Sequence, residues 1–180
     1  MAIRSTALLI GALSLGLSAI AQADPEIEVE MHKVTAEGGG AVIGTVTLKQ
    51  HEHGVLLVPE LEGLAAGLHG FHLHENGDCS PGVKDGKQTA AAAAGGHYDP
   101  ENTDTHKGPF ETGGHLGDLP ALFVNNDGVA EQPELAPNPT LKDFVGRALM
   151  IHQGGDNYSD QPEPLGGGGE RVACGVVKAE

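Results

Sequence analysis

Short stretches in which apolar and polar residues alternate recur along the chain, and this period of two is typical of strands. In residues 26–34 (EIEVEMHKV), Ile27, Val29 and Met31 alternate with polar residues, as in a strand with one buried face. The same reasoning predicts strands at residues 42–49, 55–61, 69–75, 119–125, 128–135, 147–152 and 172–178, a turn at 37–41, a hairpin at NNDG (125–128) and one helical turn at 141–146. Helical periodicity is otherwise nearly absent. About eight short strands with glycine-rich turns predict an all-β antiparallel sandwich or barrel.

Two long segments, residues 76–118 and 153–171, do not fit this strand pattern. Both are rich in glycine and aspartate, and the first also contains three histidines. Structureless segments of this length in a compact domain are usually either functional or disordered. The short runs AAAAAGG (90–96) and GGGG (166–169) would pass as linkers if taken alone. We expect two functional loops, because of the residues that these segments carry.

The first residues have the pattern of a secretory signal. Arg4 precedes an apolar stretch at 7–20, and AQA at 21–23 fits a small-x-small cleavage site. A membrane anchor is the alternative, but the apolar run is at the short end for a span. We expect residues 1–23 to be a signal peptide, no stable membrane insertion after cleavage, and one domain at 24–180. The net charge of −15, with histidine neutral, disfavours nucleic-acid binding.

The chain contains two cysteines, Cys79 and Cys174. In an exported protein an even number of cysteines predicts a disulfide. Two free buried thiols are the alternative. A disulfide would join the segment after residue 75 to the predicted last strand.

Two histidines share one face of a predicted strand. In GFHLHENGDC (70–79), His72 and His74 are two residues apart, so both side chains would stand on the face opposite Phe71 and Leu73. They could chelate a metal, or they could be two exposed histidines. His152 ends the apolar strand ALMIH. Three or four imidazoles without a thiolate or thioether nearby suit a copper ion that must visit Cu(II).

A second group of histidines lies in the long loop. His97, His106 and His115 are spaced nine residues apart, and Asp118 follows three residues after the last. Three imidazoles and one carboxylate form a tetrahedral ligand set for Zn²⁺, which would order the loop. Any one of these histidines alone would be interpreted as solvated. Their joint occurrence with the HxH pair and the two cysteines favours a metal site.

Several ordered motifs resemble those of one known family. GLHGFHLHENGDC, GGHYDP, GGHLGDLPAL, ALMIHQGGDNYSDQP and GGGGERVACGVV are similar to motifs of the copper/zinc superoxide dismutases, in particular of their exported bacterial branch. The similarity covers residues 68–178 and is weaker at 26–67. It implies an eight-stranded Greek-key sandwich or barrel, a periplasmic location, and the disproportionation of superoxide to oxygen and hydrogen peroxide. That bacterial branch contains both monomers and homodimers.

The resemblance also implies roles for single residues and one copper and one zinc ion per chain. The implied copper ligands are His72, His74, His97 and His152, and the implied zinc ligands are His97, His106, His115 and Asp118. His97 would bridge the two metals and act in catalysis. Asp156 would link a copper histidine to a zinc histidine, and Arg171 would lie beside the copper and act on the substrate. Without the resemblance, Asp156 would be interpreted as a turn residue and Arg171 as a solvated charge.

Four histidines are not assigned to either metal. His69 matches a position that packs structurally, whereas His32, His51 and His53 match no motif. Two other functions remain open at this point. The chain could be a metal-binding module on a dismutase-like fold, or a secreted sandwich whose histidines only buffer zinc.

Overall fold

The computed structural model describes residues 25–179. The predicted signal peptide at 1–23 and its cleavage point lie outside these residues. Within them, none of the helices is long and apolar enough to span a bilayer. The described strands are β1 (Glu26–Thr35), β2 (Gly38–His51), β3 (Gly54–Glu62), β4 (Gly67–His69), β5 (Phe71–His74), β6 (Gly82–Lys84), β7 (Lys87–Thr89), β8 (Leu122–Val124), β9 (Val129–Ala130), β10 (Glu134–Ala136), β11 (Ala148–His152) and β12 (Arg171–Val176). The described helical segments are η1 (Ala92–Ala94), α1 (Leu141–Phe144) and η2 (Leu165–Gly167).

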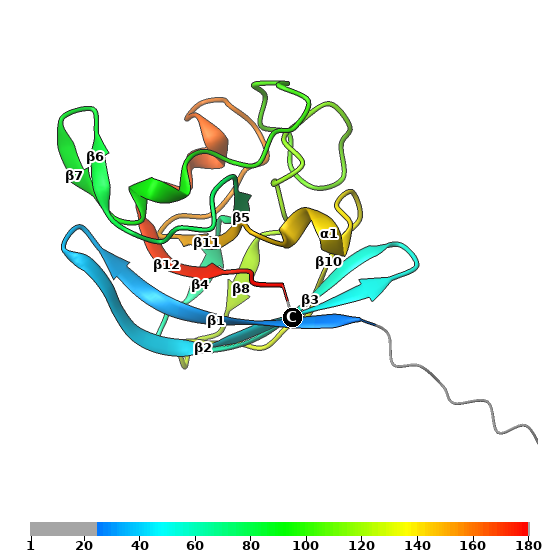
Figure 1. Cartoon of the computed structure of the whole chain (residues 1–180), viewed down its shortest axis with the longest axis horizontal. Coiled ribbons are helices and arrows are strands. Elements are labelled where there is room, and N and C mark those ends of the chain that lie inside the picture. The colour runs from blue at the N-terminus through cyan, green and yellow to red at the C-terminus, as the bar shows by residue number, and fades with distance from the viewer. Residues whose placement is uncertain (1–24, 180) are drawn as a thin grey trace, which may run out of the picture.

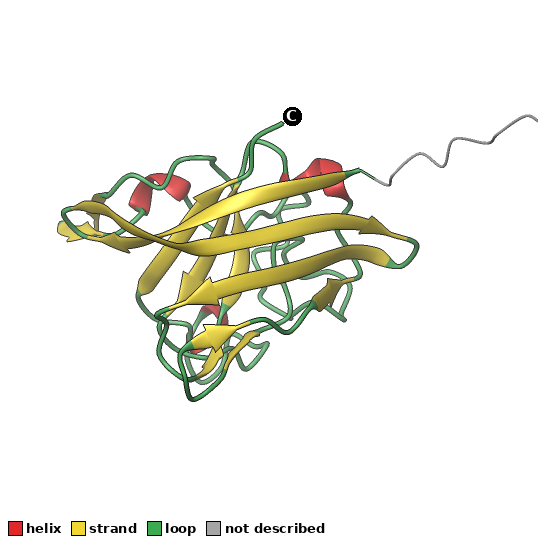
Figure 2. Ribbon diagram, turned by 90° about the horizontal axis from the view of Figure 1, so that it is seen from below, coloured by secondary structure: helices red, strands yellow, loops and turns green. Residues whose placement is uncertain are grey.

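Eight of these strands form one curled antiparallel sheet, which confirms the predicted all-β fold. The order is β10-β3-β2-β1-β12-β11-β5, and β9 pairs with β3. The longest strands, β1, β2 and β3, run side by side in both views (Figures 1 and 2). Strands β4 and β8 form a separate two-stranded sheet, as do β6 and β7.

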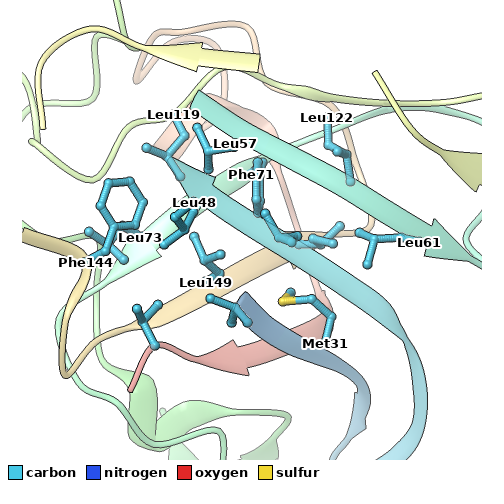
Figure 3. Close-up of a cluster of buried hydrophobic side chains, with 14 of the residues drawn as sticks. Met31, Leu48, Leu57, Leu61, Phe71, Leu73, Leu119, Leu122, Phe144 and Leu149 are labelled. Atoms are coloured by element: carbon cyan, nitrogen blue, oxygen red, sulfur yellow. The ribbon is translucent and has the colours of Figure 1, made fainter. Parts of the chain in front are cut away.

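The core lies on the concave side of the curled sheet. In β1 the buried residues Ile27, Val29 and Met31 alternate with exposed glutamates, as the sequence pattern predicts. Figure 3 shows Phe71 and Leu73 of β5 within the cluster that also contains Met31. Since Phe71 and Leu73 are 0% exposed, they fix which face of β5 is turned to the core. His72 and His74, which alternate with them, are therefore turned to the other side.

The structure corrects several predicted boundaries. The first turn comprises residues 36–37 rather than 37–41, because β2 begins at Gly38, and Gly38 and Gly39 already pair with β1. The stretch 69–75 is divided at Gly70, whose N–H donates to the carbonyl of Gly154 instead of to a neighbouring strand. The stretch 128–135 is likewise divided, into β9 and β10.

The NNDG hairpin prediction is also wrong in part. A tight turn does form, since the N–H of Gly128 donates to the carbonyl of Asn125. However, β8 pairs with β4, and β9 pairs with β3. The turn therefore connects two sheets rather than two paired strands.

The two long loops lie together on the side of the molecule away from β1 and β2 (Figure 1). The first loop contains a small hairpin, β6–β7, that the strand prediction missed. Its Asp85-Gly86 turn, in which both residues have positive φ, is the two-residue signal that would have revealed it. A disulfide joins Cys79 of this loop to Cys174 of β12, as predicted. The loop is thereby attached to the main sheet.

Candidate metal centre

Strands β5 and β11 position the first group of histidines. The two strands are antiparallel neighbours, with Met150 opposite His72 and Ala148 opposite His74. His72 and His74 are 0% and 1% exposed, so the alternative of two exposed surface histidines is excluded. A backbone bridge between His74 and His97 brings the long loop to the same place.

We call His72, His74, His97 and His152 the four-histidine group. One ring nitrogen from each of these residues lies within 4.8 Å of the others. Nδ1–H of His74 donates to the carbonyl of Gly95 at 3.0 Å, and Nδ1–H of His152 donates to the carbonyl of Gly169 at 3.2 Å. These bonds place the lone pair of each ring on Nε2.

The nitrogens left over in the four-histidine group have no hydrogen-bond partner among the described residues. They are Nδ1 of His72, Nε2 of His74 and Nε2 of His152, all buried. Buried polar atoms are nearly always hydrogen-bonded, so three orphaned lone pairs in one place need an explanation. Coordination of a metal ion would satisfy all three. The residues present therefore fit a nitrogen-ligated metal.

Burial also keeps these rings in the form that binds metals. It lowers the pKa of His72 and of His74 well below the ordinary histidine value, and the neighbouring His97 lowers both further. Burial likewise lowers the pKa of His97, and that of His152 to about 4. At neutral pH the four imidazoles are neutral, and a neutral imidazole is the form that can donate a lone pair to a metal.

We call His97, His106, His115 and Asp118 the His/Asp group, whose members also offer ligand atoms within 4.8 Å of one another. The Nδ1 atoms of the three histidines lie 2.9, 2.9 and 3.2 Å from the same atom, Oδ1 of Asp118. In a tetrahedral zinc site with ligand bonds of about 2.0 Å, neighbouring ligand atoms are about 3.3 Å apart. Nδ1 of His106 approaches Asp118 without hydrogen-bond geometry. The set therefore also fits a metal.

Without a metal, the positive charge of protonated histidines balances the negative charge of the nearby carboxylates in the His/Asp group. Burial would lower the pKa of His106, but the adjacent carboxylates of Asp118 and Asp156 raise it to about 9. The pKa of His115 is also raised, because Asp118 outweighs the effect of burial. Burial acts to raise the pKa of Asp118, yet the three imidazoles hold it far below its ordinary range. Asp118 is therefore ionised, which is the form in which a carboxylate binds a metal ion.

His97 belongs to both groups. Its ring stacks on that of His72, with centroids 3.9 Å apart. The ring centroids of His106 and His115 lie 5.3 and 5.4 Å from that of His97. Nδ1 of His97 is 2.9 Å from Asp118. One imidazole is therefore common to the two candidate sites.

Asp156 connects the two groups a second time. Its Oδ2 accepts a hydrogen bond from Nε2–H of His72, and its Oδ1 accepts one from Nε2–H of His106, both at 2.8 Å. Each bond engages Nε2, so Nδ1 of His72 remains available to the four-histidine group and Nδ1 of His106 to the His/Asp group. Hydrogen bonds of this kind fix the tautomer and orientation of metal-binding histidines.

Arg171 lies next to the four-histidine group. It pairs with His152 across β11 and β12, and its guanidinium donates to the carbonyls of Ala91 and Gly95. The carbonyl of Gly95 also accepts from His74. The side chain is therefore held beside the histidines by backbone atoms of the long loop, and it is not an extended, solvated charge.

All the site residues predicted from the sequence come together in this way, and several supporting groups were missed. The carbonyls of Ala91, Gly95 and Gly169 are backbone acceptors, which no side-chain motif reveals. Asp160 was also missed; its carboxylate accepts a bond from the backbone N–H of His106 at 2.9 Å. Only its place in the second long loop pointed to it.

The remaining histidines lie outside both groups. His69 is buried and its two ring nitrogens contact the carbonyls of His152 and Ala65, which agrees with the predicted packing role. His51 and His53 are exposed at the turn between β2 and β3. His32 contacts Glu30.

Comparison with known proteins adds an independent line. Residues 42–177 match a sequence model of the family described as copper/zinc superoxide dismutase (SODC). Superoxide dismutase (Cu-Zn) 2 of Salmonella typhimurium is 58% identical over 159 residues, which cover 88% of this chain and 91% of that protein. The Cu/Zn superoxide dismutase from Brucella abortus has a similar structure, with a TM-score of 0.83 and 49% identity over 86% of this chain and 100% of that one. The monomeric copper, zinc superoxide dismutase from Salmonella enterica gives a TM-score of 0.77 and 56% identity over the same shares, 86% and 100%.

Proposed function

The chain belongs to the copper/zinc superoxide dismutase family and disproportionates superoxide to oxygen and hydrogen peroxide, and from this premise we propose which residues hold its two metals. The family uses copper and zinc. We assign copper to the four-histidine group, because an all-imidazole set suits a redox copper. We assign zinc to the His/Asp group, because three nitrogens and one oxygen suit a closed tetrahedral zinc. The assignment is supported above all by His97, the one residue common to both groups.

The net reaction consumes two superoxide anions and two protons and releases one oxygen and one hydrogen peroxide. When bound, copper supplies the one-electron oxidation and reduction of superoxide, and zinc supplies a fixed positive charge. Nδ1 of His97 is engaged with Asp118, so Nε2 is the ring nitrogen that can take up and release a proton. A proton at that position would be available to the product peroxide.

Arg171 binds and orients the anion in this proposal. The chain is strongly acidic, so superoxide needs a local positive charge at the site. The hydrogen bonds to the Ala91 and Gly95 carbonyls hold the guanidinium in place before the substrate arrives. An already ordered side chain loses little further entropy when it binds the anion.

We also propose that residues 1–23 direct export, that the mature domain spans 24–180, and that the enzyme works in the periplasm as a monomer or homodimer without nucleic-acid or membrane partners. The sequence pattern around AQA supports cleavage. The disulfide suits an oxidising compartment. The monomeric Salmonella enterica relative supports the monomer.

The function is tested by assaying superoxide consumption by the purified chain with and without added copper. Activity that requires copper distinguishes an enzyme from a module or a zinc buffer on the same fold. A fully metal-loaded chain that does not accelerate superoxide decay would refute the proposal.

A further inference from the structure

The carboxylate of Asp156 is fully engaged. Besides His72 and His106, it accepts a bond from the backbone N–H of Tyr158 at 2.7 Å to Oδ1. The side chain is 0% exposed. With three donors on two oxygens and no solvent around them, a displaced carboxylate would lose at least one of these bonds.

Gly166 in η2 packs directly on this carboxylate. A Cβ atom on Gly166 would lie 1.9 Å from Oδ1 of Asp156 and 2.8 Å from Nε2 of His106. Real Cβ atoms do not come this close. Only a glycine at position 166 therefore leaves room for the hydrogen bond between Asp156 and His106. The backbone cannot easily move away. Its N–H donates to the carbonyl of Ser159 at 3.0 Å, and its carbonyl accepts from the N–H of Asn157 at 3.1 Å.

The neighbouring glycine differs in just this respect. Gly166 and Gly167 both have a left-handed backbone, with φ of 71° and 77°. A Cβ on Gly167, however, would meet only Cβ of Glu163, at 3.7 Å, which is an ordinary contact. Alanine at either position therefore carries a similar backbone strain. Only alanine at 166 also strikes the carboxylate.

We infer that Gly166 is a positioning residue for the zinc site, which seats the Asp156 carboxylate against Nε2 of His106 and thereby turns Nδ1 of His106 toward Asp118. The inference rests on the proposed assignment of His106 to zinc. It gives Gly166, the first residue of the GGGG run at 166–169, a function in the site, where composition alone would make the run a linker.

The test compares the zinc affinity of Gly166→Ala and Gly167→Ala in the full, disulfide-bonded protein, by competition with a chromophoric chelator. Loss of a group that orients a metal ligand typically weakens metal binding about 10–100-fold. We expect a loss of that size for Gly166→Ala and less than about 3-fold for Gly167→Ala. Nitrogen NMR of the imidazoles adds a readout that general destabilisation would not move. The Nε2–H signal of His106 should shift or exchange rapidly in Gly166→Ala and stay unchanged in Gly167→Ala.

Asp156→Ala separates this inference from the proposed function. If Asp156→Ala leaves zinc affinity unchanged, the carboxylate link itself is wrong and the inference fails with it. If Asp156→Ala weakens zinc binding while Gly166→Ala behaves like Gly167→Ala, only the inference fails. In the Asp156→Ala background, Gly166→Ala should have less than about a third of its effect in the wild type, because Oδ1, the atom with which the new Cβ clashes most severely, is gone. An equal loss in both backgrounds would overturn the inference.

The same variants also test the inference if Gly166→Ala does not fold. If Gly166→Ala alone does not fold but the double variant with Asp156→Ala does, the clash with the carboxylate is the cause, as inferred. If both fail to fold while Gly167→Ala folds, the role of Gly166 does not depend on Asp156, and the inference is wrong.

Discussion

The ring of His97 stacks on the ring of His72 at 3.9 Å, while Nδ1 of His97 faces Asp118. The two candidate sites are therefore neighbours that share one side chain, yet each retains ligands of its own. This division predicts that the two metals can be removed separately.

We predict that His106→Ala loses zinc and loosens residues 76–118 but retains copper. His106 contacts Asp118 and Asp156 and lies in that loop. Metal content by mass spectrometry and protease susceptibility of the loop would test this.

We predict the converse for His152→Ala, which should lose copper first and largely keep the fold. His152 belongs only to the four-histidine group. If both variants lost the same metal to the same extent, the division of ligands would be wrong.

For Arg171 we predict a loss of rate without a loss of metal. At roughly 5 Å and an effective dielectric constant of about 20, a unit charge attracts superoxide by at most about 3 kcal/mol. Arg171→Ala should therefore lower kcat/KM about 10- to 100-fold and make the rate less sensitive to salt. Arg171→Lys should fall between, because it keeps the charge but not the planar guanidinium. Stopped-flow rates at several ionic strengths would check this, and a wild-type kcat/KM in fully metallated Arg171→Ala at low salt would contradict it.

The disulfide should stabilise both the fold and the position of Arg171. Cys79 and Cys174 are 95 residues apart, and closing such a loop is worth about 4–5 kcal/mol in the chain-entropy model. Cys79→Ser/Cys174→Ser should lower the free energy of unfolding by about 2–5 kcal/mol in urea titrations. It should also lower kcat/KM in the still-folded enzyme, because the segment with the Ala91 and Gly95 carbonyls is released. Labelling of the denatured, unreduced wild type should modify neither cysteine.

In the metal-free protein, stability should fall as the pH drops from 6.5 to 4. The folded-state pKa of His152 is lowered to about 4 by burial, so in this range the unfolded chain binds a proton that the folded chain does not. His152 alone then accounts for a loss of up to about 3 kcal/mol. His72, His74 and His97 act in the same direction. His152→Gln should reduce the dependence of the unfolding free energy on pH, measured by urea titrations with a chelator present. An unchanged dependence would show that the burial of His152 does not cause it.

Above about pH 6.5, by contrast, the stability of the metal-free protein should fall as the pH rises. The pKa of His106 is raised to about 9 by Asp118 and Asp156, despite burial. Its stabilisation of the metal-free fold is complete below about pH 6.5 and is lost as the pH rises through 9. His106→Gln should remove this alkaline decline. If the decline persisted in the variant, another group would be responsible.

The sequence predicts the histidine positions well because a strand has a strict period of two. Once Phe71 and Leu73 face the core, His72 and His74 must share the other face. The role of Asp156 could be expected only from family resemblance, since a turn aspartate has no local signature. Gly95 and Gly166 could not be found at all. One acts through its carbonyl and the other through the lack of a Cβ, and both depend on contacts between distant segments.

Magnetic coupling between the two metals tests most directly whether both sites share His97. With Cu(II) in the four-histidine group and Co(II) replacing zinc in the His/Asp group, a common imidazole ring couples the unpaired electrons of the two ions. We predict that the Cu(II) electron paramagnetic resonance signal is nearly abolished in this derivative and returns to full intensity when Zn(II) replaces Co(II). A full-intensity Cu(II) signal with one Co(II) bound per chain would show that His97 does not join the two sites.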